Sequence, residues 1–204
     1  HFENAMMRIL RTAEYDVDRE IDKLKKTLNL FDGLSVQSAT VLKIIHDVKN
    51  QKDAALVKYS KRFDKVILSP KDFRVKEKEI EEAYRKIPLP FVKSIQKAVN
   101  NIWTYQEHIR IRKVRPLKAD GMVLDTVYAP LDSTGVYVPG GAASYPSTVL
   151  MNAIPARVAG VKKIIMTTPP SQDGTIPPER LVAAKEAGVS EIYRVGGAQA
   201  IAAL

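Results

Sequence analysis

The stretch GVYVPGG, residues 135–141, indicates the fold of the second half of the chain. An apolar run of strand character leads directly into two consecutive glycines, and a segment of helical character begins near Ser147. Consecutive glycines let a backbone approach a ligand closely, and a helix N-terminus offers free amide groups to phosphate. The stretch therefore predicts a strand, a ligand-facing loop and a helix, in that order.

A second stretch, VGGAQ at residues 195–199, repeats this order. Between the two stretches the sequence predicts strands at 164–167 and 191–195, with helices at 147–159 and 178–187. This alternation predicts an α/β fold with a Rossmann-like parallel sheet, whose ligands bind at the carboxyl ends of the strands. Both glycine pairs would then face one crevice. Neither loop matches a strict dinucleotide or P-loop motif, so each pair could equally form only a tight turn.

Upstream, apolar residues recur at helical spacing, and we expect helices near 38–48, from Asp53 to before Ser69, over 77–86 and over 91–109. We also expect a strand over 122–128. The chain is thus predicted to divide into a mainly helical segment at 6–115 and the Rossmann-like domain at 116–204. Residues 1–5 are predicted to be an artificial leader. Because the chain ends within an apolar helix, we expect the domain to be truncated at its C-terminal side.

The composition of the 204 residues is that of a globular protein, with 45% hydrophobic and 27% charged residues. The absence of cysteine excludes disulfides, zinc–thiolate sites, iron–sulfur clusters and a cysteine nucleophile within these residues. No apolar stretch is long enough to cross a bilayer, and no signal region follows the start. We therefore expect a soluble cytoplasmic protein without membrane contact.

The net charge of +9 does not by itself indicate nucleic-acid binding. Residues 121–204 carry equal numbers of basic and acidic side chains, so the whole excess lies in residues 1–120. There the two signs mostly alternate, as on a solvated helix face. The most basic cluster, at residues 110–115, accompanies no nucleic-acid motif, and we expect no nucleic-acid partner.

Two single residues could contact a nucleotide cofactor. Tyr137 precedes the first glycine pair and could stack on a base, although tyrosine in a strand often serves packing alone. Gln199 lies in the first helical turn after the second pair, where it could bind a cofactor or simply meet free backbone amides. His46 and His108 have no neighbouring ligand at metal spacing, so we expect surface or helix-packing roles for them.

The loops and the helices that follow them resemble those of histidinol dehydrogenases. The similarity rests on residues 135–141, on YPSTVLMNAIPA at 145–156 with AGV at 159–161, and on VGGAQAIAAL at 195–204. Residues 41–64 also resemble the N-terminal helical pattern of that family. The resemblance thus extends from about residue 35 to the end of the chain.

The resemblance implies a zinc-dependent enzyme that oxidises L-histidinol through L-histidinal to L-histidine, with two NAD molecules as hydride acceptors. It implies that Tyr137 and Gln199 contact NAD. The family's zinc ligands (a Gln, two His and an Asp), its Glu–His acid/base pair and most of its substrate contacts would lie beyond Leu204. No catalytic or metal-binding residue is therefore assigned within this chain. The resemblance also implies a homodimer, and we expect this chain to be inactive on its own.

Two other interpretations remain open at the level of sequence. One is a nucleotide-binding module that is not part of an enzyme. The other is a basic helical adaptor whose first 115 residues bind an acidic partner or RNA, with strong salt dependence.

Overall fold

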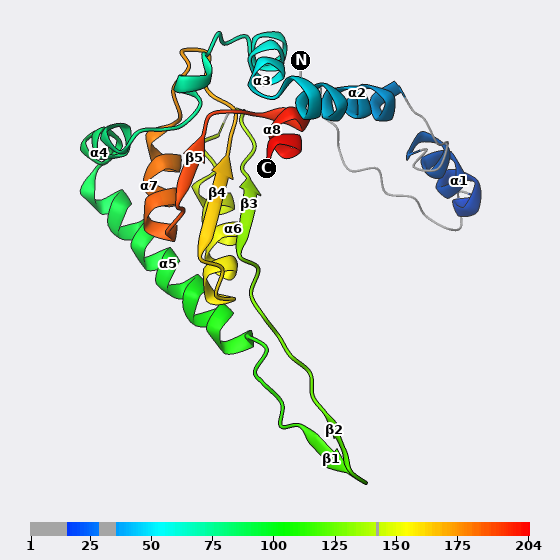
Figure 1. Ribbon diagram of the computed structural model, residues 1–204. Coiled ribbons are helices and arrows are strands. Elements are labelled where there is room, and N and C mark those ends of the chain that lie inside the picture. The colour runs from blue at the N-terminus through cyan, green and yellow to red at the C-terminus, as the bar shows by residue number, and fades with distance from the viewer. Residues whose placement is uncertain (1–15, 29–35, 142) are drawn as a thin grey trace. The chain divides into compact units, whose positions relative to one another are not determined.

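The computed structural model describes residues 16–28, 36–141 and 143–204 of the chain (Figure 1). The chain divides into two compact units, His1–Val41 and Leu42–Leu204. The first unit contains helix α1 (Val17–Leu28) and the beginning of α2 (Val36–Gln51). The predicted artificial leader at residues 1–5 lies outside the described residues.

The second unit is built around a three-stranded parallel sheet in the order β3-β4-β5. Each connection between neighbouring strands contains one helix, as the alternation of elements in the sequence predicts. The α/β fold class and its parallel sheet are thereby confirmed. The elements in chain order are β3 (Ser133–Tyr137), α6 (Pro146–Val158), β4 (Lys163–Thr167), α7 (Pro178–Ala187), β5 (Glu191–Tyr193) and α8 (Gly197–Ala203).

The strand register aligns the carboxyl ends of all three strands. Tyr137 of β3 lies beside Thr167 of β4, which lies beside Tyr193 of β5. The ladder continues one residue further, because the Val138 amide donates to the Thr167 carbonyl at 2.9 Å and the Thr168 amide donates to the Tyr193 carbonyl at 3.0 Å. The loops that follow the strands therefore start from one edge of the sheet.

One face of the sheet packs against helices α6 and α7, which are covered in turn by α4 (Glu77–Lys86) and α5 (Leu89–Ile109) (Figure 1). The buried side chains of this layer form the larger apolar core. Val136, Met166 and Ile192 contribute to it from the three strands. Residues of the N-terminal helical segment and of the sheet thus share one core.

The opposite face of the sheet carries a second, smaller core. Successive strand residues point to opposite faces, so Tyr137 and Tyr193 join this cluster while their neighbours join the first. Its buried members come from α2, α3 (Asp53–Tyr59), the segment 66–73, Val195 and α8. Between α3 and α4 lie a single π-helical turn, η1 (Ser60–Asp64), and a 3-10 turn, η2 (Pro70–Asp72).

The outer edge of β5 is covered by the segment that follows η2. The Val75 amide donates to the Ile192 carbonyl at 2.9 Å, and the Arg194 amide donates to the Phe73 carbonyl at 2.8 Å. These bonds pair backbone groups that an edge strand would otherwise expose.

Residues 122–128 differ from the prediction of a single strand. Strand β2 covers only Met122–Leu124 and pairs with β1 (Leu117–Ala119), which the sequence analysis did not predict. The two strands form an antiparallel hairpin separate from the parallel sheet. At its tip Asp120 and Gly121 both have positive φ, 49° and 80°. An Asp-Gly pair favours this type of hairpin turn, a local signal that outweighed the apolar alternation.

The helix expected from Asp53 to before Ser69 is also shorter than predicted. Helix α3 ends at Tyr59, and the π-helical turn η1 ends at Asp64, before Lys65, whose backbone is left-handed with φ of 61°. Helix α6 contains Pro155 in its interior and continues past it to Val158. Within the described ranges, none of the helices has the length and apolar composition needed to cross a membrane.

Candidate functional site

The two glycine pairs meet at the carboxyl edge of the sheet, on either side of Pro169. A Cβ atom added to Gly140 would lie 2.5 Å from Cγ of Pro169, and one added to Gly196 would lie 2.5 Å from its Cβ. The loops after β3, β4 and β5 therefore touch one another. This confirms that both pairs lie at one edge, and it shows that Gly140 and Gly196 are needed for close packing.

A hydrogen bond joins the two predicted cofactor loops directly. The Gly197 amide donates to the Tyr137 hydroxyl at 3.1 Å. Gly197 has a φ of 68°, in the left-handed region that favours glycine. Because Tyr137 accepts this bond through its oxygen, it still carries a proton that it can donate to a ligand. Tyr137 is half-buried, with its ring against the smaller core.

Gln199 is fully buried in the first turn of α8, and neither atom of its side-chain amide has a hydrogen-bond partner. The amide lies where a side chain at Gly197 would otherwise project, since a Cβ there would be 2.6 Å from the Gln199 Oε1. Buried amide groups are nearly always paired in proteins. The Gln199 amide therefore has a donor and an acceptor that no protein group uses at this edge of the sheet.

The end of β4 contributes polar groups that the sequence analysis missed. The Thr167 hydroxyl is buried without a partner, and the Thr168 hydroxyl accepts from Nη1 of Arg180 at 2.7 Å. Arg180 lies in the first turn of α7 and is itself buried. Its Nε donates to the Ser144 carbonyl at 2.9 Å and its Nη2 to the Ala143 carbonyl at 3.3 Å. Arg180 thus holds the loop after the first glycine pair against β4.

The Arg180 guanidinium places a positive charge behind this edge of the sheet. No carboxylate among the described residues forms an ion pair with it, and burial lowers its pKa. Arginine stays protonated even so, because its ordinary pKa is far above neutral. This charge would favour an anionic group at the edge of the sheet.

Replacing Arg180 by methionine is expected to lower the free energy of unfolding by about 2 kcal/mol, because three oxygen acceptors lose their donor. Urea unfolding would measure the change. Arg85→Met, at an exposed position of α4, is the matched control and should change stability by less than about 0.5 kcal/mol. Equal effects of the two substitutions would contradict the loop-holding role.

A cavity of about 320 Å³ lies near these strand ends, on the face that carries Tyr137 and Tyr193. Its walls are mostly apolar and come from α3, α8 and the sheet. The unpaired Thr167 hydroxyl belongs to a residue of this wall. Its wall includes Ala200, the residue that follows Gln199.

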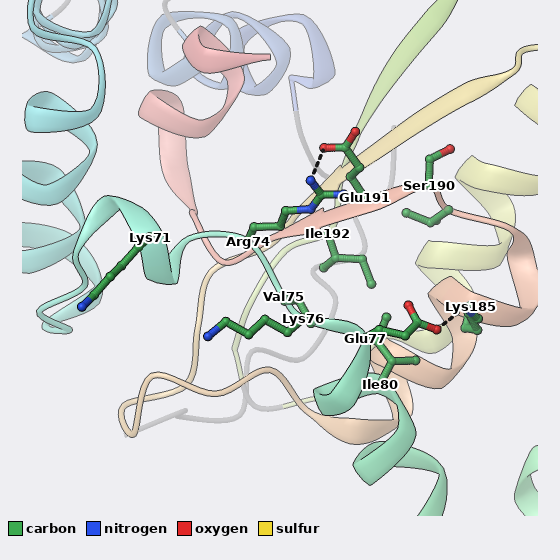
Figure 2. Close-up of a pocket in the computed structure, with 11 residues that line it drawn as sticks. Lys71, Arg74, Val75, Lys76, Glu77, Ile80, Lys185, Ser190, Glu191 and Ile192 are labelled. Atoms are coloured by element: carbon green, nitrogen blue, oxygen red, sulfur yellow. Dashed lines mark hydrogen bonds and ion pairs between the residues drawn. The ribbon is translucent and has the colours of Figure 1, made fainter.

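A larger cavity, of about 470 Å³, lies beside the amino end of β5 and contains none of the predicted site residues (Figure 2). Figure 2 shows two ion pairs among its charged side chains, Lys185 with Glu77 and Arg74 with Glu191. The Glu191 carboxylate also accepts from the Tyr193 hydroxyl and pairs with Lys163, and these contacts lower its pKa. Because its charges are largely paired within the protein, this cavity is not the candidate site.

Among residues 16–28, 36–141 and 143–204, no group of three or more His, Cys, Asp or Glu side chains could hold a metal ion. His46 contacts Asn50, with 2.9 Å between His46 Nε2 and Asn50 Nδ2 on the exposed side of α2. His108 lies exposed in the last turn of α5.

The sequence carried a signal for the missed residues. Thr167 is the last residue of β4 and Thr168 follows it, so their position alone placed them at the ligand edge. Arg180 had no comparable signal, because a basic residue at the start of a helix is usually solvated.

A family model described as histidinol dehydrogenase matches residues 32–204. A histidinol dehydrogenase of Heliobacterium mobile is 46% identical over 200 residues, and one of a Synechococcus strain is 43% identical over 202; each match covers 98% of this chain and 45% of the relative. The crystal structure of histidinol dehydrogenase from Elizabethkingia anophelis superposes with a TM-score of 0.77 at 37% identity, covering 85% of this chain and 40% of that one. The chain thus spans less than half the length of these relatives.

Proposed function

The chain belongs to the histidinol dehydrogenase family, and we propose that it forms the NAD-binding part of an enzyme that oxidises L-histidinol through L-histidinal to L-histidine. The observation that carries the cofactor role is the unpaired amide of Gln199 at the carboxyl edge of the sheet. In open parallel sheets, nucleotides bind at this edge.

The residues present fit a dinucleotide in three respects. Gly140 and Gly196 keep both loops free of side chains where the strand ends converge. The buried charge of Arg180 favours the negative charge of a diphosphate. The Tyr137 hydroxyl and the Gln199 amide supply a donor and an acceptor for ribose or amide groups.

Bound NAD would supply the hydride acceptor, and this chain would bind and orient it. Tyr137 would contact the cofactor while it keeps its bond to the Gly197 amide. Because Gln199 is fully buried, its contact with NAD requires the loop at Gly196–Gly197 or the loop held by Arg180 to move. Such movement would couple cofactor binding to the arrangement of both loops.

We propose zinc as the metal of the complete enzyme on the basis of the family resemblance alone. The family's zinc ligands and acid/base residues correspond to no residue described above, so no metal-dependent step is assigned to this chain. On the same basis we propose a homodimer that acts on a small-molecule substrate in the cytoplasm, as part of histidine biosynthesis.

The test of this function is histidinol-dependent NADH formation, measured with zinc present. The chain alone is compared with a version extended by the missing part of the enzyme. Activity in the extended protein alone is the expected result. Absence of activity in an extended protein that is folded and loaded with metal would contradict the proposed substrate.

Tyr137→Phe is expected to raise the KM for NAD several-fold with little change in kcat, because it removes a hydroxyl that contacts the cofactor but no reacting group. Steady-state kinetics of the extended enzyme would measure both constants. Tyr105→Phe, at an exposed position of α5, is the matched control. An unchanged KM together with normal stability would exclude Tyr137 from the cofactor site.

A further inference from the structure

The segment that connects α5 to β3, residues 110–131, is exposed along its whole length. We name it the arm. It includes the hairpin of β1 and β2, which is joined to the rest of the second unit by two extended stretches (Figure 1). The hairpin strands pair only with each other among the described residues.

The arm is unusually apolar for an exposed segment. Nine of its large hydrophobic side chains are each more than half exposed, whereas scattered single residues would be ordinary for a protein surface. They are Ile111, Val114, Leu117, Met122, Val123, Leu124, Val127, Tyr128 and Leu131. An isolated two-stranded hairpin is only marginally stable in water, so the arm needs a covering structure.

Apolar side chains occupy both faces of the hairpin. Met122, Val123 and Leu124 are consecutive, so Val123 points to the face opposite its two neighbours. Leu117 lies directly across from Leu124. A single helix laid on one face would leave the other in water, so the occupant must enclose the hairpin or add strands to its edges.

The apolar surface continues from the arm to the second unit. A shallow cavity of about 640 Å³ lies where the arm meets α5 and α6. Ile111, Tyr128 and Leu131 line it from the arm, and Pro155 and Ala159 line it from the α6 region. A partner that encloses the hairpin would therefore also cover this side of α6.

We propose that the arm is the docking surface for the part of the enzyme's own polypeptide that lies outside this chain. The relatives are more than twice as long as the stretch that this chain matches. Each relative therefore contains further polypeptide of a size comparable to this chain. Attachment in one polypeptide gives that further polypeptide a high effective concentration at the arm. The proposal rests on family membership and is independent of the NAD site.

The test is site-specific photo-crosslinking in the extended enzyme. A photoreactive phenylalanine analogue replaces Val123 in one variant and exposed Lys78 of α4 in a control. The first variant should form crosslinks several-fold more efficiently, at the mass of one polypeptide, and mass spectrometry should map them to residues outside the present chain. Crosslinks that join two copies would assign the arm to a second subunit and overturn the proposal, as would a yield no greater than the control's.

The photoreactive side chain at Val123 is larger than valine and could itself disturb docking, so the melting temperature provides an independent test. Val123→Asp should markedly lower the melting temperature of the extended enzyme, because it places a carboxylate in the enclosed surface. Lys118→Asp, on the paired strand, introduces the same side chain at a position that is already polar. Equal melting temperatures for the two variants would show that the arm stays exposed.

Discussion

Replacing Gln199 by methionine is expected to stabilise the protein and to weaken NAD binding at the same time. Methionine has nearly the same length as glutamine and needs no hydrogen-bond partner. The substitution removes two buried polar atoms that are unpaired in the absence of ligand. Since each such atom costs about 1–3 kcal/mol, the free energy of unfolding should rise by at least about 1 kcal/mol.

The loss of affinity follows from the same amide. A ligand that pairs with it gains hydrogen bonds in a site shielded from water, and without them the Kd for NAD should rise roughly tenfold, which corresponds to about 1.4 kcal/mol. Urea unfolding and calorimetric titration of the extended enzyme would measure the two changes.

Gln51→Met, at an exposed position near the end of α2, is the matched control, and it should leave both quantities unchanged. The opposite signs distinguish a ligand-binding amide from a structural one. If Gln199→Met destabilised the protein and left NAD affinity intact, Gln199 would be a packing residue only.

Gly196→Ala is expected to destabilise the protein by about 1–3 kcal/mol and to weaken NAD binding strongly. The added methyl group would lie 2.5 Å from Cβ and 3.1 Å from Cα of Pro169, and a proline backbone cannot rotate away as a flexible side chain can. The loops after β4 and β5 must then move apart, and this movement would lengthen or break the hydrogen bond from the Gly197 amide to the Tyr137 hydroxyl.

Gly121→Ala separates this steric effect from backbone strain. Gly121 has a positive φ, but a Cβ there meets no atom within 4 Å. Its substitution should cost stability of about 1 kcal/mol without any effect on NAD affinity. Thermal unfolding and NAD titration would test both variants, and equal NAD affinities would show that the convergence at Pro169 does not position the cofactor site.

Much of the fold could be predicted from the sequence, because its periodic patterns match its packing. The helices at 77–86 and 178–187 have the predicted bounds, and both glycine pairs follow strands of one parallel sheet. Helix α4 buries one side and exposes the other, whereas most of α7 lies within the core. Their sequence patterns therefore reflect their environment directly.

The arm shows where the same reasoning fails. Alternation over residues 122–128 predicted one strand, yet only Met122–Leu124 forms a strand, and it lies exposed in a separate hairpin. Apolar alternation predicts that a segment will be buried, but it does not predict which structure will pack against it. In this case the covering structure belongs, in our proposal, to polypeptide outside the chain.

The candidate site was only partly predictable. Strand position indicated Tyr137, and position after the glycine pair indicated Gln199 as a possible ligand or a helix-start residue. The unpaired state of the Gln199 amide depends on tertiary packing, which no local pattern encodes. The same holds for Arg180, whose contacts reach across more than thirty residues to Ala143 and Ser144.

A crystal structure of the extended enzyme with bound NAD would test most directly whether this chain binds NAD at the carboxyl edge of its sheet. We predict that the dinucleotide lies across the edge formed by Gly140, Pro169 and Gly196. The Tyr137 hydroxyl and the Gln199 amide should each lie within hydrogen-bond distance of it, about 3.5 Å or less. NAD bound elsewhere in the enzyme, with Gln199 still buried and unpaired, would contradict the claim.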